Sequence, residues 1–376
     1  MDDCVILREL ATACGRRFGH ATLNAPKSLN ALSLAMIDRL APQLDAWAAD
    51  PAIVGVVLDG CGDRAFCAGG DVAALYRAIQ AAAPGEAPAE AKAFFEREYR
   101  LDYRIHTYPK PIVCWGHGIV MGGGIGLLAG ASHRVVTPTT RMAMPEISIG
   151  LYPDVGGSWF LRRMPGRTGL FLALSGAPLN AADARFAGLA DFIVADDERE
   201  RLTALIADTR WDAPGSDASL ANHARLGALL DRLGATCAVP ASPLREHFDR
   251  IEAVIGHDGL ADIARRLTAL AEDADPWLAS AGKTFVRGAP SSAQLSWALW
   301  QRTRHLSLAD VLRTEFHVSV ACTAHGDFAE GVRALLIDKD RKPRWQYASL
   351  AEVPKEVIEN HFMPRYHGPH PLSDLV

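Results

Sequence analysis

The chain has 376 residues, of which 49% are hydrophobic and 22% charged, and its formal net charge at pH 7 is −5. A chain of this size and composition can bury a large hydrophobic core. The slightly acidic balance, without a long basic run, argues against a nucleic-acid-binding surface. No apolar stretch approaches the ~20 residues that span a bilayer, so we expect no membrane segment.

The seven cysteines are odd in number, scattered, and contain no C-x-x-C pair. This pattern favours reduced thiols over a disulfide framework or a zinc site, and we expect no bound metal. The N-terminal sequence MDDCVILREL is acidic and has neither a signal-peptide core nor the arginine-rich character of a transit peptide. We therefore expect a cytoplasmic protein.

The first half of the chain alternates short strand-like runs with helical runs. Val5–Leu7 and Ala21–Leu23 have strand character, and Ser33 is a good N-cap for a helix. One face of that helix repeats apolar residues at three- and four-residue spacing: Leu34, Ile37, Leu40, Leu44 and Trp47. Pro42 lies inside the pattern and is expected to kink the helix or shift its boundary.

Two apolar runs, Ile53–Leu58 and Ile112–Trp115, suit strands buried on both faces between helices. The alternation of strands and helices predicts an α/β core over residues 1–195. Residues 196–376 lack strand-like runs and predict a helical C-terminal region. Its expected helices are Glu198–Arg210, Ser219–Leu233, Leu244–Ile255, Leu260–Ala271, Ala293–Arg304 and Leu308–Thr323.

Three glycine-rich segments interrupt the α/β pattern: Phe66–Asp71, Met121–Gly126 and Met144–Gly157. The first two follow the two apolar strands, and a helical sequence follows the second. A strand–glycine–helix junction leaves unpaired N–H groups at the helix start, where glycine lets a ligand oxygen come close. The alternative for each segment alone is a tight turn.

Three common glycine motifs are excluded at these segments. The dinucleotide pattern G-x-G-x-x-G, counted from Gly122 and Gly124, would need glycine where Leu127 stands. The phosphate-binding loop fails because no Gly-Lys-Ser/Thr follows. A G-x-S-x-G elbow at Ser132 would need glycine at the position of Arg134.

Together with two further motifs, the segments resemble the enoyl-CoA hydratase/isomerase (crotonase) superfamily, and more closely its 3-hydroxyisobutyryl-CoA hydrolase branch. The first motif is Pro26–Leu32, with the sequence PKSLNAL, and the second is Asp327–Asp340, with the sequence DFAEGVRALLIDKD. The resemblance covers nearly the whole chain. It implies an α/β fold, a crotonase-type ββα spiral core with a helical C-terminal region.

The resemblance also implies an oxyanion hole made of the backbone N–H groups of Gly70 and Gly123. A thioester carbonyl gains negative charge as its carbon becomes tetrahedral, and two preoriented N–H donors stabilise that charge. Losing one such donor raises a barrier by about 3–4 kcal/mol in better-studied enzymes.

Side chains at three positions distinguish the reactions of the superfamily. Hydratases carry a glutamate in the helix after the glycine triplet, where this sequence has Gly126, and a second one that matches Glu146. Asp154 stands where hydratases usually have glycine. The missing carboxylate argues against addition of water to a double bond, and the pair of Glu146 and Asp154 resembles the hydrolase branch.

Two roles stay open for Glu146. It attacks the thioester and forms an anhydride that water then opens, or it acts as the general base for a direct attack by water. Asp154 positions that water or protonates the leaving sulfur, and a second acid close by raises the pKa of one of the two. The structural alternatives are a solvated turn glutamate for Glu146 and an N-cap of a helix beginning near Gly156 for Asp154.

Four more residues match substrate-binding positions. Glu98 corresponds to a position that binds the acyl hydroxyl group, and its alternative is a surface charge on an amphipathic helix. Lys27 is expected near the phosphates of coenzyme A (CoA), and Ala68 and Asp71 contact substrate through the first glycine segment. CoA is part of the substrate, so no separate cofactor is expected.

The resemblance thus predicts hydrolysis of 3-hydroxyisobutyryl-CoA in valine breakdown. One alternative is an enoyl-CoA isomerase or hydratase of the same superfamily. An alternative of another class is a non-catalytic scaffold that binds RNA or protein. The expected partner is an acyl-CoA, with no nucleic acid or membrane, and homo-oligomer formation is left open.

Overall fold

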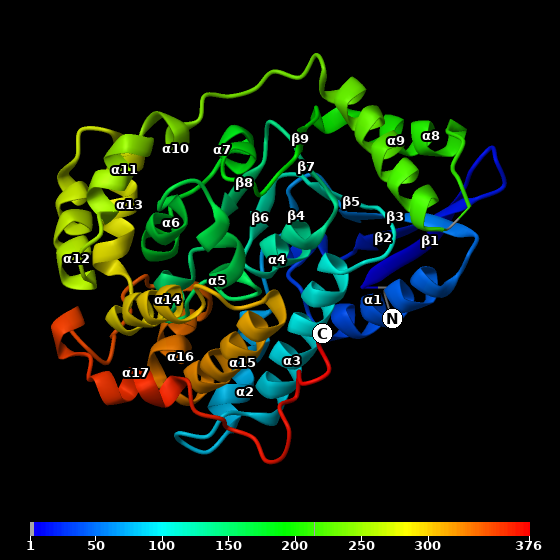
Figure 1. Cartoon of the computed structure of the whole chain (residues 1–376). Helices are drawn as coiled ribbons and strands as arrows, with labels where there is room; N and C mark the ends of the chain where they lie inside the picture. Colours follow the sequence, from blue (N-terminus) through cyan, green and yellow to red (C-terminus); the bar gives the residue numbers. More distant parts are fainter. Residues whose placement is uncertain (1–3, 214) are drawn as a thin grey trace. The chain divides into compact units, whose positions relative to one another are not determined.

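The computed structural model describes residues 4–213 and 215–376 (Figure 1). The chain folds into two compact units that are interleaved in sequence. The first unit comprises Met1–Gly70, Leu101–Met142 and Leu179–Ser242, and the second comprises Asp71–Arg100, Ala143–Pro178 and Pro243–Val376.

A six-stranded sheet with the order β1-β2-β3-β5-β7-β9 forms the centre of the first unit. Its first two strands pair antiparallel and the others pair parallel. The strands are β1 Val5–Ala11, β2 Arg17–Leu23, β3 Ile53–Gly60, β5 Ile112–Gly116, β7 His133–Val136 and β9 Phe192–Ile193. A smaller sheet has the order β4-β6-β8, with β4 Ala65–Cys67, β6 Ile119–Met121 and β8 Arg141–Ala143. The predicted parallel α/β architecture is confirmed.

The helices of the first unit are α1 Leu34–Ala49, α4 Gly123–Gly130, α7 Ala181–Phe186, α8 Arg199–Asp208 and α9 Ser216–Gly234. Helix α3 (Ala89–His106) contributes residues to both units. The second unit contains α2 Val72–Ala81, α5 Gly157–Phe160, α6 Thr168–Ser175, α10 Pro243–Glu246, α11 Phe248–Ile255, α12 Leu260–Ala269, α13 Pro276–Arg287, α14 Pro290–Arg302, α15 Leu308–Ala324, α16 Gly326–Val332 and α17 Lys355–His361.

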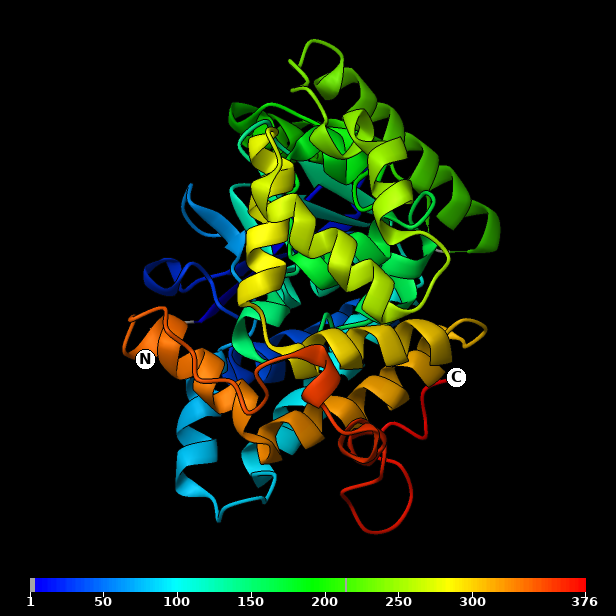
Figure 2. The same ribbon diagram turned by 90° about the vertical axis from the view of Figure 1, so that its left-hand side faces the viewer.

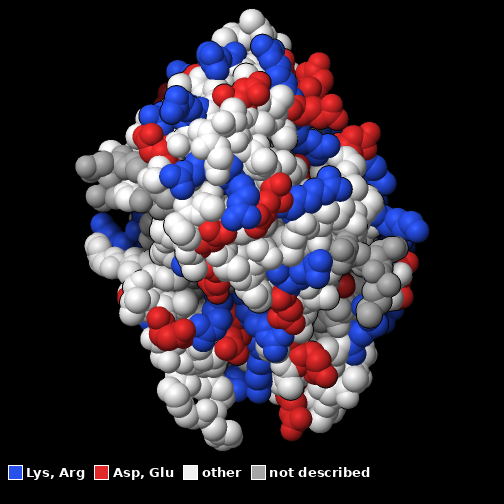
Figure 3. All heavy atoms as spheres, turned by 90° about the vertical axis from the view of Figure 1, so that its right-hand side faces the viewer, with Lys and Arg blue, Asp and Glu red and all other residues white. Residues whose placement is uncertain are grey.

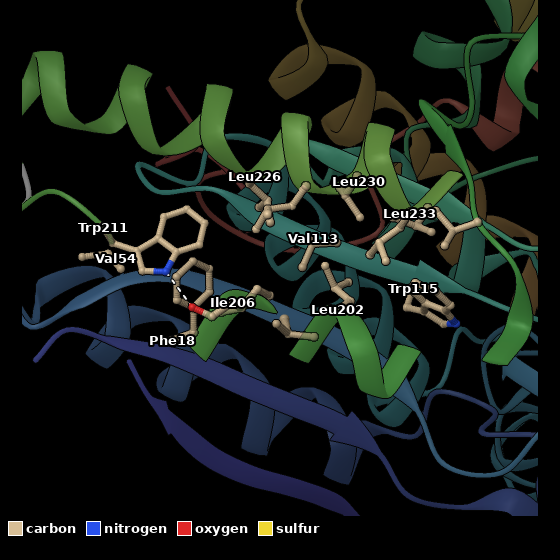
Figure 4. Packing of buried hydrophobic residues seen from close by; sticks show 14 residues of the cluster. Phe18, Val54, Val113, Trp115, Leu202, Ile206, Trp211, Leu226, Leu230 and Leu233 are labelled. Atoms are coloured by element: carbon tan, nitrogen blue, oxygen red, sulfur yellow. Dashed lines mark hydrogen bonds between the residues drawn. The ribbon is translucent and has the colours of Figure 1, made fainter. Parts of the chain in front are cut away.

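The core of the first unit lies between its sheet and helices α8 and α9 (Figure 4). Phe18 on β2 meets the ring of Trp211 edge-on, with ring centroids 4.7 Å apart. The indole N–H of Trp211 donates to the carbonyl of Ile206 at 2.8 Å, so this large side chain is buried without an unpaired donor. Leu226 and Leu230 of α9 close the cluster and are fully buried.

The first predicted helix forms where its sequence pattern places it. Ser33 is the N-cap of α1, and its hydroxyl accepts a hydrogen bond from the N–H of Met36. Pro42 lies inside the helix but does not end it, so the predicted shift of the boundary is wrong. The apolar face of α1 is buried against the strands, and this packing offsets the cost of the proline.

Every described element after Ile193 is a helix, which confirms the predicted helical character of the C-terminal region. The pattern missed α13, because Asp275 and Pro276 suggest a chain break but in fact form its N-cap and first turn. Helices α12 and α13 run alongside each other (Figures 1 and 2). The division at residue 195 follows this change of element type and stays a prediction as a domain boundary.

The surface charges and the helix sequences bear on possible nucleic-acid and membrane contacts. On the face drawn in Figure 3, basic and acidic side chains are intermixed and form no broad basic area. Within the described residues, no helix is long and apolar enough to cross a membrane.

Two truncations on helix α9, one of a buried and one of an exposed side chain, test the core of the first unit. Leu230→Ala removes a fully buried side chain of α9, and we expect it to lower the free energy of unfolding by about 2–5 kcal/mol. Leu220→Ala on the same helix removes a side chain that is 77% exposed, and we expect a change below about 0.5 kcal/mol. Urea-unfolding midpoints measure both, and equal effects would contradict this core.

Candidate active site

The first glycine segment ends the β4 strand in the first unit. The N–H of Leu32 donates to the carbonyl of Gly69 at 2.8 Å, and Leu32 and Gly70 form a parallel bridge. In this pairing the N–H of Gly70 points away from the bridge partner. Gly69 has φ of +108°, a conformation that suits glycine and turns the chain at this point.

The second glycine segment begins helix α4 beside the first segment. Gly122 is its N-cap with φ of +46°, and Gly123 is the first helical residue. A Cβ on Gly124 would lie 2.3 Å from the carbonyl oxygen of Cys67, so the helix start and the end of β4 are in close contact. Within the described part of the chain, neither the N–H of Gly70 nor that of Gly123 donates to a protein acceptor.

Two other predicted substrate residues lie in the first unit. Ala68 is partly buried, and its N–H donates to the carbonyl of Leu29 at 3.0 Å. Its backbone N–H is therefore already used within the protein. Lys27 is exposed in the short helix Pro26–Ser28, where its ammonium group is open to solvent.

Glu146 lies in the second unit and opens the short 3₁₀ helix η2, Glu146–Ile149. Its side chain is 4% exposed, and Oε2 has no hydrogen-bond partner among the described residues. Burial, followed by the charge of Asp154, raises the pKa of Glu146 well above its ordinary value. The alternative of a solvated turn glutamate is wrong.

The C-terminal motif holds the turn that carries Glu146. A Cβ on Gly150 would lie 2.2 Å from the carbonyl oxygen of Asp327, and a Cβ on Gly331 would lie 2.4 Å from the carbonyl carbon of Ile149. Helix α16 therefore packs on η2 at backbone-to-backbone distance. The side chain of Asp327 accepts from the N–H of Gln346 at 2.7 Å, which ties the following segment to the same place.

Asp154 is also buried in the second unit, with 5% of its surface exposed. The hydroxyl of Tyr99 on α3 donates to its Oδ2 at 2.7 Å. Burial raises the pKa of Asp154 to about 6, although the hydrogen bond from Tyr99 lowers it. Neither Asp154 nor Glu146 forms an ion pair with a cation in the described residues.

A third carboxyl group, Glu315 of α15, was not predicted. It is fully buried and accepts from the N–H groups of Gly156 at 2.7 Å and Ser158 at 2.9 Å. Glu315 thus satisfies the start of α5, and the alternative that Asp154 caps this helix is wrong. The sequence signal that could have identified Glu315 is its position between Leu312 and Ser319, on the side of α15 that helical spacing predicts to be buried.

The remaining predicted residues of the second unit are Glu98 and Asp71. Glu98 is 2% exposed, so its alternative as a surface charge is wrong, and its negative charge helps to raise the pKa of neighbouring Tyr99. Asp71 is the N-cap of α2 and accepts from the N–H of Ala74 at 3.0 Å. In the structure, Asp71 thus caps helix α2.

Two histidines near the glycine triplet have structural contacts. A ring nitrogen of His117 lies 2.8 Å from the carbonyl oxygen of Gly62, and one of His133 lies 2.9 Å from that of His223. Burial lowers the pKa of both histidines, which keeps them neutral near pH 7. The described residues include no group of three or more histidine, cysteine, aspartate or glutamate side chains arranged to hold a metal ion.

Comparison with known sequences shows which family the chain resembles. A model of the enoyl-CoA hydratase/isomerase family matches residues 18–362. The chain is 38% identical over 346 residues to the mitochondrial 3-hydroxyisobutyryl-CoA hydrolase of Gallus gallus, covering 92% of this chain and 86% of the relative. Identity to the Homo sapiens protein of the same name is 36% over 347 residues, with the same coverage.

Solved structures show the same fold. A carnitinyl-CoA dehydratase from Mycobacterium thermoresistibile superposes with a TM-score of 0.83 at 38% identity, covering 96% of this chain and 97% of the other. An enoyl-CoA hydratase from Rhodobacter sphaeroides 2.4.1 superposes with a TM-score of 0.80 at 34% identity, covering 96% and 98%. The predicted crotonase-type fold is thereby confirmed.

The buried acids predict how stability depends on pH. Burial raises the pKa of Glu315 from 4.5 to about 8, so the folded protein binds a proton more tightly than the unfolded chain. Stability should therefore fall as the pH rises from about 5 to 8. The side chain of Glu315→Gln cannot titrate. We expect the free energy of unfolding of this variant to fall less steeply with pH, by up to about 1.4 kcal/mol per pH unit.

Urea-unfolding midpoints between pH 5 and pH 8 measure this slope. The variant should also be less stable at every pH, because an amide cannot accept from both N–H groups in the same way. Glu356→Gln, at an exposed position of α17, is the control and should keep the wild-type slope. An unchanged slope in Glu315→Gln would show that this carboxyl group does not hold a proton in the folded state.

Proposed function

The chain belongs to the enoyl-CoA hydratase/isomerase family, and we propose that it hydrolyses 3-hydroxyisobutyryl-CoA to 3-hydroxyisobutyrate and CoA. The observation that carries this proposal is the buried pair of Glu146 and Asp154 in a chain whose curated relatives are named as hydrolases of this thioester. Gly126 is buried within α4, so no carboxylate stands where hydratases have their first glutamate. Hydration of a double bond is therefore not favoured.

In the proposed reaction the N–H groups of Gly70 and Gly123 donate to the thioester oxygen. Their lack of protein acceptors supports this role, since a free N–H at a helix start is suited to a developing negative charge. Both donors are backbone groups, so substitutions there would act through the shape of the loops. Lys27 is proposed to lie near the phosphates of CoA, and Ala68 and Asp71 are proposed to contact the substrate.

Glu146 is proposed to start the chemistry through Oε2, the oxygen without a protein partner. A raised pKa makes this carboxylate a better base near neutral pH than an exposed glutamate. The same oxygen can instead attack the acyl carbon and form an anhydride. Borohydride added during turnover separates the two routes, because it reduces an anhydride at Glu146 to an alcohol and leaves a free carboxylate unchanged.

The wider context of the reaction is part of the same proposal. Hydrolysis of 3-hydroxyisobutyryl-CoA belongs to valine breakdown. We propose a cytoplasmic location, whereas the curated relatives are named as mitochondrial proteins. Cell fractionation decides between these locations, and sedimentation of the pure protein measures whether it forms a homo-oligomer.

The central prediction concerns release of thiol from 3-hydroxyisobutyryl-CoA by the pure protein. Glu146→Gln removes the base or nucleophile with little change of volume, and we expect the turnover number to fall by about 10²–10⁴-fold. Glu86→Gln, at an exposed position, should keep the wild-type rate. A wild-type protein that releases no thiol, or a Glu146→Gln variant as active as wild type, would refute the proposal.

A second prediction concerns the acyl hydroxyl group, which Glu98 is proposed to bind. Wild-type protein should prefer 3-hydroxyisobutyryl-CoA to isobutyryl-CoA, because only the first can donate a hydrogen bond from an acyl hydroxyl group to this carboxylate. We expect Glu98→Ala to reduce the ratio of the two kcat/KM values at least about tenfold. A ratio that does not change places the acyl hydroxyl elsewhere.

A further inference from the structure

Three hydroxyl groups without an assigned role form a row next to Asp154. The hydroxyl oxygen of Tyr99 lies 2.7 Å from Oδ2 of Asp154 and 2.7 Å from Oγ of Ser319. The hydroxyl oxygen of Tyr152 lies 2.8 Å from the same Oγ and 2.8 Å from the carbonyl oxygen of Glu315. All three hydroxyl-bearing residues are at most 1% exposed, so water does not interrupt the row.

A count of hydrogens constrains the protonation of this row. It contains four contacts of hydrogen-bonding length, and each needs one hydrogen between its two oxygens. The three hydroxyl groups supply three hydrogens, while a carbonyl oxygen and an ionised carboxylate supply none. With an ionised Asp154, one contact would join two oxygens without a hydrogen, which is unfavourable in a buried place.

We propose that Asp154 is protonated in the resting protein, and that Tyr99, Ser319 and Tyr152 are positioning residues that keep this proton available for the departing sulfur. An ionised Asp154 accepts from Tyr99, and protonation of Asp154 reverses this contact: Asp154 then donates to Tyr99, Tyr99 to Ser319, Ser319 to Tyr152, and Tyr152 to the carbonyl of Glu315. Each of the four contacts then contains one hydrogen, and all four hydrogen bonds point the same way along the row. The use of the proton rests on the proposed thioester hydrolysis, whereas its presence follows from the row itself.

The charged and titratable groups around Asp154 support a neutral form. They are Glu98 and Tyr99 on α3, Glu146 on η2, and Glu315 and Cys322 on α15. None of them is a cation, so an ionised Asp154 would have no opposite charge beside it. Burial raises the pKa of both Asp154 and Glu146.

The row also decides which of the two acids holds the proton. A proton on Asp154 finds an acceptor in the Tyr99 hydroxyl, 2.7 Å away. A proton on Oε2 of Glu146 would have no acceptor among the described residues. The geometry thus favours a neutral acid at Asp154 and leaves Glu146 ionised, the form it needs as base or nucleophile.

The proposed step balances along the general-base route. The oxygen of water bonds to the acyl carbon while one of its protons passes to Glu146, and the carbon–sulfur bond breaks with its electron pair on sulfur. Asp154 gives its proton to that sulfur, which leaves as the CoA thiol. The pair then holds one proton on Glu146 in place of Asp154, and transfer of this proton back to Asp154 restores the resting state.

Infrared spectra of the full chain with ¹³C-labelled aspartate carboxyl groups test the proton without any substrate. We expect a protonated-carboxyl band between pH 5 and pH 6, where an ordinary aspartate is already ionised, that is absent from Asp154→Asn. In Ser319→Ala two contacts remain, and the hydroxyl groups of Tyr99 and Tyr152 supply the two hydrogens that they need. The row then no longer requires a proton on Asp154. The band of this variant should therefore titrate away at a pH lower by about one unit or more, a tenfold change in proton affinity.

Tyr152→Phe is a second variant with the same count, two contacts and two hydrogens, and should shift the band in the same direction. Tyr108→Phe is the control, because it removes another hydroxyl, on a half-buried tyrosine, that donates to the carbonyl of Leu44 at 2.7 Å. This variant should keep the wild-type titration. If Ser319→Ala does not fold, Tyr152→Phe alone tests the count.

The pH dependence of thiol release provides the link to catalysis. The fall of kcat at high pH should move to lower pH in Ser319→Ala and Tyr152→Phe by the same amount as the infrared band. A wild-type protein without the aspartic band between pH 5 and pH 6, or variants that titrate as wild type does, would overturn the proton assignment. A normal band in a protein that hydrolyses no thioester would instead refute only the proposed function.

Discussion

The second unit buries two acidic side chains, Glu146 and Asp154, and the described residues supply no cation that pairs with either of them. Glu146 and Asp154 are almost inaccessible to solvent, and each raises the free energy of ionising the other. A lysine or arginine beside them would remove this repulsion but would also hold both acids ionised. The Tyr99 hydroxyl contacts Asp154 instead, and a hydroxyl group can donate or accept as the protonation of the acid changes.

The glycines of the two loops and of the acid turn act by a common physical means. Gly124 and Gly150 each stand where a side chain would collide with the backbone of another segment. Close approach of backbones fixes the donors and the turn without using side chains as spacers. The candidate site residues therefore depend on close packing at positions without a functional side chain, such as Gly331 against Ile149.

The sequence predicted most of the elements because their signals are local. Alternating apolar runs indicate β3 and β5, and Ser33 with its apolar face indicates α1. The acid pair was found through resemblance to a family, since no periodicity distinguishes Glu146 from an exposed glutamate. Glu315 and the row from Tyr99 to Tyr152 were missed because tertiary contacts between α3, α15 and the segment before α5 create them. Such contacts join residues far apart in the chain, and single-sequence patterns contain no record of them.

The contact between η2 and α16 also bears on how the protein is made. The turn with Glu146 rests on backbone from a segment close to the C-terminal end. During synthesis the early segments leave the ribosome long before this support exists. A growing polypeptide thus cannot pack the turn with Glu146 against α16 until the C-terminal helices have been made.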